Sequence, residues 1–252
     1  MKPAASATVG GPALVLIPGL MCDRELWAQQ SAALTASGIA CRIAAHGSAD
    51  SLADMAQAVL AANPGPLAVV GHSMGGRVAL EIARQAGTRL RGAALLDTGF
   101  RTRSPGEPGE RESEGRLRLL QQAREQGMRA MALNWLRGML HPQRLQDGAL
   151  IEAIVTMFER RSVAEFAAQI QALLQRPDAS ELLPRIRCPT LLLCGEQDQW
   201  SPPAQHREMA LLIPGSLFTL VPDCGHMSPM EQPAAVSAAL LAWFERVARF
   251  SP

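Results

Sequence analysis

The sequence predicts an α/β fold built on a mostly parallel sheet, and two observations carry this prediction. Short apolar runs of strand length alternate with segments whose apolar residues recur at helical spacing. The runs are apolar throughout, as expected of parallel strands that are buried on both faces. We therefore expect about six strands with helices on both faces of the sheet. The loops that carry function should lie at the strands' carboxyl ends.

Local signals place the individual elements. Gly38 ends one helix as a C-cap, and Ser51 with Asp54 three residues later resembles a capping box at the start of the next. Asn, Pro and Gly over 63–66 predict a turn. The expected strands are 13–17, 39–44, 67–70, 92–96, 190–194 and 216–221, and the expected helices beside them are 25–37, 51–62, 76–86, 202–212 and 233–250.

A purely helical region separates the fourth strand from the fifth. Residues 101–118 are rich in Arg, Glu, Gly and Pro, which predicts a solvated, mobile connection. Apolar residues then recur at helical spacing over 117–139 and 148–174. A helical block of this size that interrupts an alternating pattern is best interpreted as an inserted cap. We expect a core domain of residues 1–100 and 184–252, with a helical cap of residues 101–183 inserted after the strand that ends at Asp97.

Charge and composition argue against several kinds of partner. The 252 residues carry 24 Lys and Arg against 23 Asp and Glu, which gives a net charge of +1. No global field attracts nucleic acid or an anionic membrane, so we expect neither as a partner. The first apolar run, 13–17, is shorter than a signal-peptide core, and no stretch approaches the ~20 residues of a membrane span. We expect a soluble, cytoplasmic protein, either a monomer or a homodimer.

The cysteines predict neither disulfides nor a metal site. The number of cysteines, five, is odd, and a chain of this length can be stable without disulfide bonds. Both observations favour reduced thiols. Cys194, Cys224 and His226 could be imagined as a zinc cluster, but no C-x-x-C or H-x-x-x-H pair supports it. Small buried hydrophobes are the better interpretation of these cysteines. We expect no metal and no cofactor.

The stretch from Gly71 to Gly75 has the pattern G-x-S-x-G between a predicted strand and a predicted helix. Such a nucleophile elbow reverses the chain so sharply that side chains at the glycine positions would collide with neighbouring backbone. The turn presents the hydroxyl of Ser73 at the carboxyl edge of the sheet. A glycine-rich turn with an incidental serine is the alternative, and the strand and helix around it favour the elbow.

A serine hydroxyl needs a base to take its proton and a third group to orient that base. Asp198 follows the fifth strand and His226 follows the sixth, so both should lie at the same sheet edge as Ser73. The order Ser, Asp, His is the one expected on this scaffold. We therefore predict a catalytic triad of these three residues. Other acids near the expected positions are Asp97, Glu196 and Asp223.

Four other histidines compete with His226 for the role of base. His72 lies inside the elbow, where its side chain should point away from the serine. His46 follows a strand but lacks a similar context, and His141 and His206 are expected at the surface or in the cap. Position and spacing both favour His226.

The negative charge that develops on a substrate carbonyl needs two fixed backbone N–H donors. Met74 follows the serine at a helix N-terminus and supplies one expected donor. Leu20, in the loop after the first strand, is our choice for the second, and Gly19 lets the backbone approach the substrate. Cys22 lies nearby, but no elbow surrounds it, so we do not expect it to be the nucleophile.

The chain resembles the α/β-hydrolase superfamily over essentially its whole length, on the motifs 71–76, 195–198 and 225–233. It is most similar to small bacterial esterases, enol-lactonases and pimeloyl-acyl-carrier methyl esterases. The resemblance implies an α/β-hydrolase fold and an acyl-enzyme on the serine, under a helical cap. Two departures stand out. The oxyanion loop has Pro18-Gly19 where many relatives have His-Gly, and the N-terminus leaves little room for the usual opening hairpin.

We expect a serine hydrolase that cleaves a carboxylic ester or lactone of a small to medium, mostly apolar substrate. The same triad also supports C–C bond hydrolysis, thioester cleavage or cofactor-free perhydrolysis, and a receptor-like protein that binds its ligand with little turnover is an alternative of another class. The sequence selects none of its many arginines as a carboxylate ligand. The candidates for lining the pocket are Met21, Trp135, Met139, Met157, Trp200 and Met227.

Overall fold

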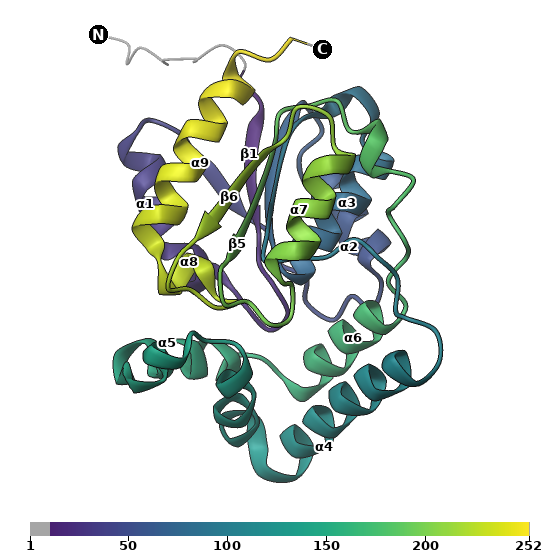
Figure 1. The fold of residues 1–252 in the computed structure, drawn as a ribbon, viewed down its shortest axis with the longest axis vertical. Coiled ribbons are helices and arrows are strands. Elements are labelled where there is room, and N and C mark those ends of the chain that lie inside the picture. The colour runs from purple at the N-terminus through teal and green to yellow at the C-terminus, as the bar shows by residue number, and fades with distance from the viewer. Residues whose placement is uncertain (1–10, 252) are drawn as a thin grey trace, which may run out of the picture.

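The computed structural model describes residues 11–251 and contains one sheet of six strands, in the order β2-β1-β3-β4-β5-β6 (Figure 1). Every neighbouring pair is parallel. The predicted strand number and parallel arrangement are therefore confirmed, whereas the expectation about an opening hairpin concerns residues outside the described part. The strands are β1 (Ala13–Ile17), β2 (Cys41–Ile43), β3 (Leu67–His72), β4 (Leu90–Leu96), β5 (Thr190–Gly195) and β6 (Leu217–Val221).

The position of each strand in the sheet explains its pattern of burial. All residues of β3 and β5 are buried, because helices cover both faces of these inner strands. The edge strands β2 and β6 are mostly only partly buried. The continuous apolar runs of the sequence thus belong to the middle of the sheet, whose carboxyl ends meet at one edge.

Helices cover both faces of the sheet. Figure 1 shows α1 and α9 on one side and α2, α3 and α7 on the other. The helices of this layer are α1 (Ala28–Ala36), α2 (Leu52–Ala62), α3 (Met74–Gln85), α7 (Pro203–Leu212), the short α8 (Ser228–Glu231) and α9 (Pro233–Ala248). In the described part of the chain, none of the helices is long and apolar enough to cross a membrane.

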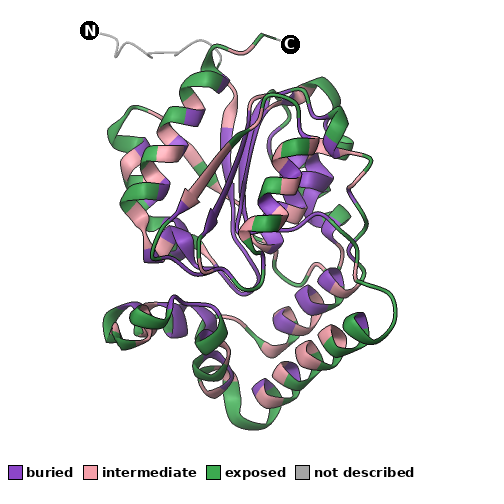
Figure 2. Ribbon diagram, in the orientation of Figure 1, coloured by how far each residue is buried: buried purple, intermediate pink, exposed green. Residues whose placement is uncertain are grey.

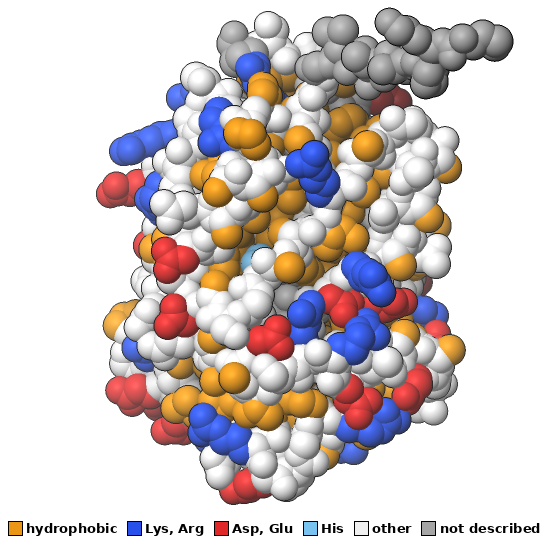
Figure 3. Space-filling view, turned by 180° about the vertical axis from the view of Figure 1, so that it is seen from behind, with side chains coloured by type: hydrophobic (Ala, Val, Ile, Leu, Met, Phe, Trp, Pro, Cys, Tyr) orange, Lys and Arg blue, Asp and Glu red, His pale blue; other side chains and the backbone are white. Residues whose placement is uncertain are grey.

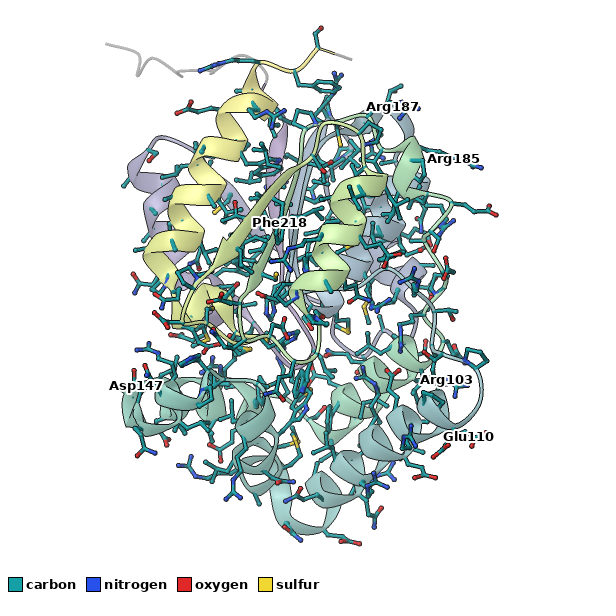
Figure 4. All side chains as sticks on the ribbon, viewed as in Figure 1. Arg103, Glu110, Asp147, Arg185, Arg187 and Phe218 are labelled. Atoms are coloured by element: carbon teal, nitrogen blue, oxygen red, sulfur yellow. The ribbon has the colours of Figure 1, made fainter. Side chains whose placement is uncertain are left out.

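Three helices between β4 and β5 form a separate layer below the sheet in Figure 1: α4 (Glu107–Trp135), α5 (Gly148–Glu159) and α6 (Val163–Leu174). They lie at the carboxyl end of the strands, and their outer surfaces are largely exposed (Figure 2). Figure 4 labels Glu110 near the start of α4 and Asp147 at the start of α5, on opposite sides of this layer. A block of helices therefore lies between β4 and β5, where the sequence predicted one.

The expectation of a mobile connection over 101–118 is wrong in its second half. Helix α4 begins at Glu107 and continues to Trp135, with a kink at Gly127, where φ is 85°. Its first turns are polar, but acids and arginines four residues apart pair along it, as Glu112 and Arg116 do. The apolar periodicity starts only later, and for this reason the sequence pattern placed the start of the helix too late.

Candidate active site

Ser73 lies in the sharp turn that joins β3 to α3. Its backbone has φ 54° and ψ −115°, a strained conformation for a residue with a side chain. A Cβ on Gly71 would lie 2.2 Å from the carbonyl oxygen of Gly75, and one on Gly75 would lie 2.1 Å from that of Ile17. The two glycines are thus required by backbone packing, as the elbow pattern predicts.

The structure brings Ser73, His226 and Asp198 into one chain of hydrogen bonds. The Nε2 atom of His226 lies 2.9 Å from the serine Oγ, and its Nδ1 atom lies 2.8 Å from Oδ2 of Asp198. The histidine and aspartate are buried, while the serine is partly exposed to a cavity. In this arrangement the imidazole can accept the proton of the serine hydroxyl while Asp198 orients the ring.

Asp198 is held as an ionised acceptor. Its second oxygen, Oδ1, accepts hydrogen bonds from the N–H groups of Trp200 and Ser201, both at 2.9 Å. Burial acts to raise the pKa of Asp198, but His226 and these two N–H groups outweigh burial and lower it. A negative carboxylate here fixes the imidazole orientation and stabilises its charged form.

The other acids near the site do not contact His226. Glu196 and Asp223 are exposed. Asp97 is buried and accepts hydrogen bonds from the N–H of Gly195 at 3.0 Å and from the hydroxyl of Ser228. Burial, with the nearby Asp198, raises its pKa. Asp97 thus joins the two loops that carry the acid and the base.

The loop of His226 is fixed by a buried carboxylate that sequence reasoning did not single out. Glu231 accepts hydrogen bonds from the N–H groups of His141 (2.7 Å), Gly225 (3.1 Å) and Met227 (3.0 Å). His141 belongs to the segment after α4, and Gly225 and Met227 are the two neighbours of His226 in the chain. Glu231 lies within the motif 225–233, but only the tertiary structure shows which donors it accepts from.

The remaining histidines have structural contacts. The Nε2 atom of His72 lies 2.8 Å from the carbonyl oxygen of His226, and burial is the main cause that lowers the pKa of His72 to about 3. His206 accepts from the N–H of Thr98 at 3.1 Å and is fully buried in α7, so the expectation of a surface or cap position for it is wrong. His141 is also buried.

The backbone around the predicted oxyanion hole leaves two donors free. Leu20 and Met74 line the cavity beside Ser73, and neither N–H has a hydrogen-bond acceptor among residues 11–251. The N–H of Met21, by contrast, donates to Oε1 of Gln169 at 2.9 Å. Cys22 also lines the cavity, but burial raises the pKa of its thiol, which opposes formation of a nucleophilic thiolate.

A cavity of about 680 Å³ opens above Ser73, between the sheet edge and the helices α4 and α6. Four of the six predicted pocket residues line it: Trp135, Met139, Trp200 and Met227. Met21 and Met157 do not, and both are completely buried elsewhere in the core. These two predictions are wrong. Met157 packs on the buried side of α5, and Met21 lies in the loop after β1, where its side chain is buried in the core.

Aromatic rings form one wall of the cavity. Trp135 stacks on Trp200 with ring centroids 5.4 Å apart and also packs against Phe158 and Phe166. Trp200 in turn lies 5.0 Å from the ring of His226. This wall is apolar and lies next to the hydrogen-bonded triad, so it can hold an apolar part of a ligand against the reacting groups.

Another part of the cavity lining is polar and cationic, which the sequence did not predict. Arg77, Arg116 and Arg176 line it together with Glu112. One signal in the sequence could have selected Arg77: it follows Ser73 by four residues, and thus by about one helical turn. The other residues come from distant segments. On the face shown in Figure 3, acidic and basic side chains are interspersed over the lower half of the molecule.

The comparisons with known proteins agree with this fold. The chain belongs to the alpha/beta hydrolase family, whose model matches residues 14–239. It is 32% identical over 184 residues to the 2-succinyl-6-hydroxy-2,4-cyclohexadiene-1-carboxylate synthase of Klebsiella pneumoniae, a match that covers 68% of this chain and 66% of that protein.

Solved structures extend the similarity to almost the whole chain. A thermophilic esterase from Thermogutta terrifontis, solved with malate bound, is 30% identical, with a TM-score of 0.83 over 94% of this chain and 91% of that one. The enol-lactonase of Burkholderia xenovorans is 24% identical, with a TM-score of 0.78 over 94% and 92% of the two chains. The second likeness is one of fold alone. Membership of a family of hydrolases supports the prediction that this protein is an enzyme.

Proposed function

We propose that this protein is a serine hydrolase that cleaves a carboxylic ester or lactone through an acyl-enzyme. The observation that carries the proposal is the hydrogen-bonded chain from Ser73 through His226 to Asp198 at the floor of a cavity. Family membership and the esterase neighbour support the same reaction class. A receptor-like protein would not need all three groups in contact.

In the proposed mechanism, Nε2 of His226 takes the proton of Ser73 as the serine oxygen attacks the substrate carbonyl. The N–H groups of Leu20 and Met74 stabilise the oxyanion, and losing one such donor typically costs about 2.7–4 kcal/mol. The imidazolium then protonates the leaving alcohol, and an acyl-serine forms. Water, deprotonated by the same imidazole, releases the acid and restores the serine. The nucleophile, the base and both oxyanion donors in these steps are groups of this chain.

The aromatic wall supports a mostly apolar portion of the substrate next to the scissile bond, because Trp135 and Trp200 lie beside His226. The similar proteins include an esterase, an enol-lactonase and a 2-succinyl-6-hydroxy-2,4-cyclohexadiene-1-carboxylate synthase, so the fold accommodates several reactions. C–C bond hydrolysis, thioester cleavage and perhydrolysis on the same triad are alternatives that a substrate panel separates.

We further propose that residues 101–183 act as a cap domain over the core of residues 1–100 and 184–252. The cap supplies Trp135 and the adjoining polar residues of α4, so it shapes the pocket while the core supplies the triad. We also propose that the substrates are small molecules and that the protein is cytoplasmic.

The test is labelling with a fluorophosphonate probe, combined with turnover of short p-nitrophenyl esters. We expect the wild type to label and hydrolyse, and Ser73→Ala to lose labelling and at least about 10³-fold in kcat. Ser113→Ala, outside the cavity, is the matched control and should behave like the wild type. Equal labelling of Ser73→Ala would contradict the assignment of the nucleophile, and an inert wild type would contradict the enzyme.

A further inference from the structure

Three arginines and one glutamate meet at the polar end of the cavity. Glu112 pairs with both Arg176 and Arg116: its two oxygens lie 2.7 Å from the Nη1 and Nη2 atoms of Arg176, and one of them lies 3.0 Å from Nη2 of Arg116. The single carboxylate is therefore shared between two guanidinium groups. Together with Arg77, the cluster has one negative and three positive side chains.

Arg77 is the member of the cluster without a carboxylate partner. Its Nη1 donates to the carbonyl oxygen of Arg101 at 2.9 Å, and no Asp or Glu in the described residues forms an ion pair with it. Burial, followed by the like charges of Arg176 and Arg116, lowers its pKa. A guanidinium in such a place is stabilised by any anion that reaches it.

The other cationic side chains at the rim differ in this respect. Arg101 pairs with Glu208, and Arg111 pairs with Glu107, one helical turn earlier on α4. Their charges are already compensated, and both side chains are exposed. The cluster therefore has two uncompensated positive charges, one on Arg77 and one shared between Arg116 and Arg176.

The backbone of Gly99 lies close against this guanidinium. Gly99 lines the cavity, and a Cβ at this position would lie 2.8 Å from Nη2 of Arg77 and 2.8 Å from Oε1 of Gln205. Position 99 must therefore be glycine for the Arg77 guanidinium to keep its place in the cavity lining. A planar carboxylate can accept both N–H groups of such a fork.

Arg77 and Ser73 are rigidly related. Both belong to the first turn of α3, and the N–H of Arg77 donates to the carbonyl oxygen of Ser73 at 3.3 Å. Both side chains line the same cavity, with the aromatic wall that contains Trp135 lining another part of it. If a ligand bound to Arg77 through its acid group, that group would thus be held at a fixed distance from the serine.

We propose that Arg77, backed by Arg116 and Arg176, binds a free carboxylate of the substrate, so that the preferred substrates are esters or lactones that also carry an acid group. This inference rests on the proposed hydrolase function. In the overall reaction, one water molecule hydrolyses the ester group to an alcohol and a carboxylic acid, so the product carries a second acid group. The carboxylate on Arg77 is unchanged by the reaction and serves to position the scissile bond.

The experiment compares monomethyl and dimethyl esters of linear dicarboxylic acids of four to eight carbons, which differ only in the free acid. For the best chain length, we expect the wild type to have at least 10-fold higher kcat/KM on the monoester. Arg77→Met should lower that value about 10- to 100-fold, the usual effect of losing a charge-assisted hydrogen bond, while changing the value for the diester less than about 3-fold.

Arg118→Met is the matched control, since it removes one exposed positive charge from α4 outside the cavity. It should leave both values unchanged. Equal use of the two esters by the wild type, or an equal loss on both esters in Arg77→Met, would overturn the proposal. Arg77→Lys provides a second variant that keeps the charge, and it should retain part of the preference for the monoester.

A binding measurement separates this inference from the proposed function. Calorimetry of the same dicarboxylic acids with Ser73→Ala requires no turnover, and we expect at least 10-fold weaker binding when Arg77→Met is added. If the wild type hydrolyses nothing but the acids still bind through Arg77, the hydrolase proposal fails and the carboxylate site stands. Absence of binding to both proteins would overturn the site.

Discussion

At the scale of single residues, the backbone is strained at four positions that share one edge of the sheet. Met21, Ser73, Asp97 and Asp223 are the non-glycine residues with positive φ in the described chain, and they follow β1, β3, β4 and β6. Such conformations persist only where the surroundings impose them, and they cluster at functional sites. The edge that carries Ser73, Asp198 and His226 is thus the part of the fold where strained backbone conformations fix the direction of side chains.

Gly75→Ala tests the packing of this edge. The added Cβ would lie 2.1 Å from the carbonyl oxygen of Ile17 and 2.7 Å from that of Pro18. The elbow and the loop of Leu20 must then move apart, so we expect kcat to fall about 100-fold and stability to fall by about 1–3 kcal/mol. Ester turnover and urea denaturation measure the two effects.

Gly65→Ala is the control for that substitution, because nothing lies within 4 Å of its would-be Cβ. It should leave activity unchanged. If Gly75→Ala behaves like this control, the close approach of the elbow to β1 is not required for activity.

At the scale of elements, the site is assembled from loops that buried acids hold together. Asp97 joins the loop after β5 to the segment after β6, and Glu231 joins the His226 loop to the segment that follows α4. A buried acceptor left with the wrong partner costs about 1–3 kcal/mol, so these contacts specify the loop positions strongly. The cap is thereby connected directly to the proposed catalytic base.

Glu231→Gln tests this connection with little change of volume. Both oxygens of the carboxylate accept N–H donors, so the amide group of glutamine must face at least one donor. We expect a loss of about 1–3 kcal/mol in stability and about 10-fold in kcat/KM, because His226 is displaced. Thermal denaturation and ester kinetics measure these losses. Glu245→Gln, an exposed position on α9, should change neither, and unchanged kinetics in Glu231→Gln would show that it does not position the base.

At the scale of the whole molecule, burial of neutral histidines makes stability depend on pH. Burial lowers the pKa of His72 to about 3 and that of His206 to about 4, from an ordinary value of 6.5. The unfolded chain therefore binds more protons than the folded one between those values and 6.5. Stability from each histidine is complete above pH 6.5 and is lost as pH falls below it.

Each of these histidines should lower the free energy of unfolding by about 2 kcal/mol between pH 7 and pH 5. Burial raises the pKa of Asp97 and of Glu231, which acts in the opposite direction over acidic pH, so a matched variant isolates the histidine. We expect the stability difference between wild type and His206→Gln to change by about 2 kcal/mol over this range. Urea denaturation at each pH measures it, and parallel pH curves for the two proteins would contradict the prediction.

The sequence by itself determined the sheet, the elbow and the chain order of the three residues of the proposed triad. Continuous apolar runs identify buried parallel strands, and parallel strands place their carboxyl ends at one edge. The sequence alone therefore predicted that Ser73, Asp198 and His226 meet. Local steric rules also required Gly71 and Gly75. These features depend on short-range pattern and on topology, which the chain order encodes.

Only the tertiary structure decided which side chains face the cavity. Met157 and Trp135 have similar sequence contexts, yet the first is buried in the core and the second lines the pocket. The polar start of α4 predicted a mobile connection, but Glu112 there pairs with Arg176, 64 residues away in the chain. Within residues 11–251, Arg77 forms no such ion pair. Whether a charge has an ion-pair partner depends on contacts between segments that are distant in the chain. The local periodicity of apolar residues does not predict such contacts.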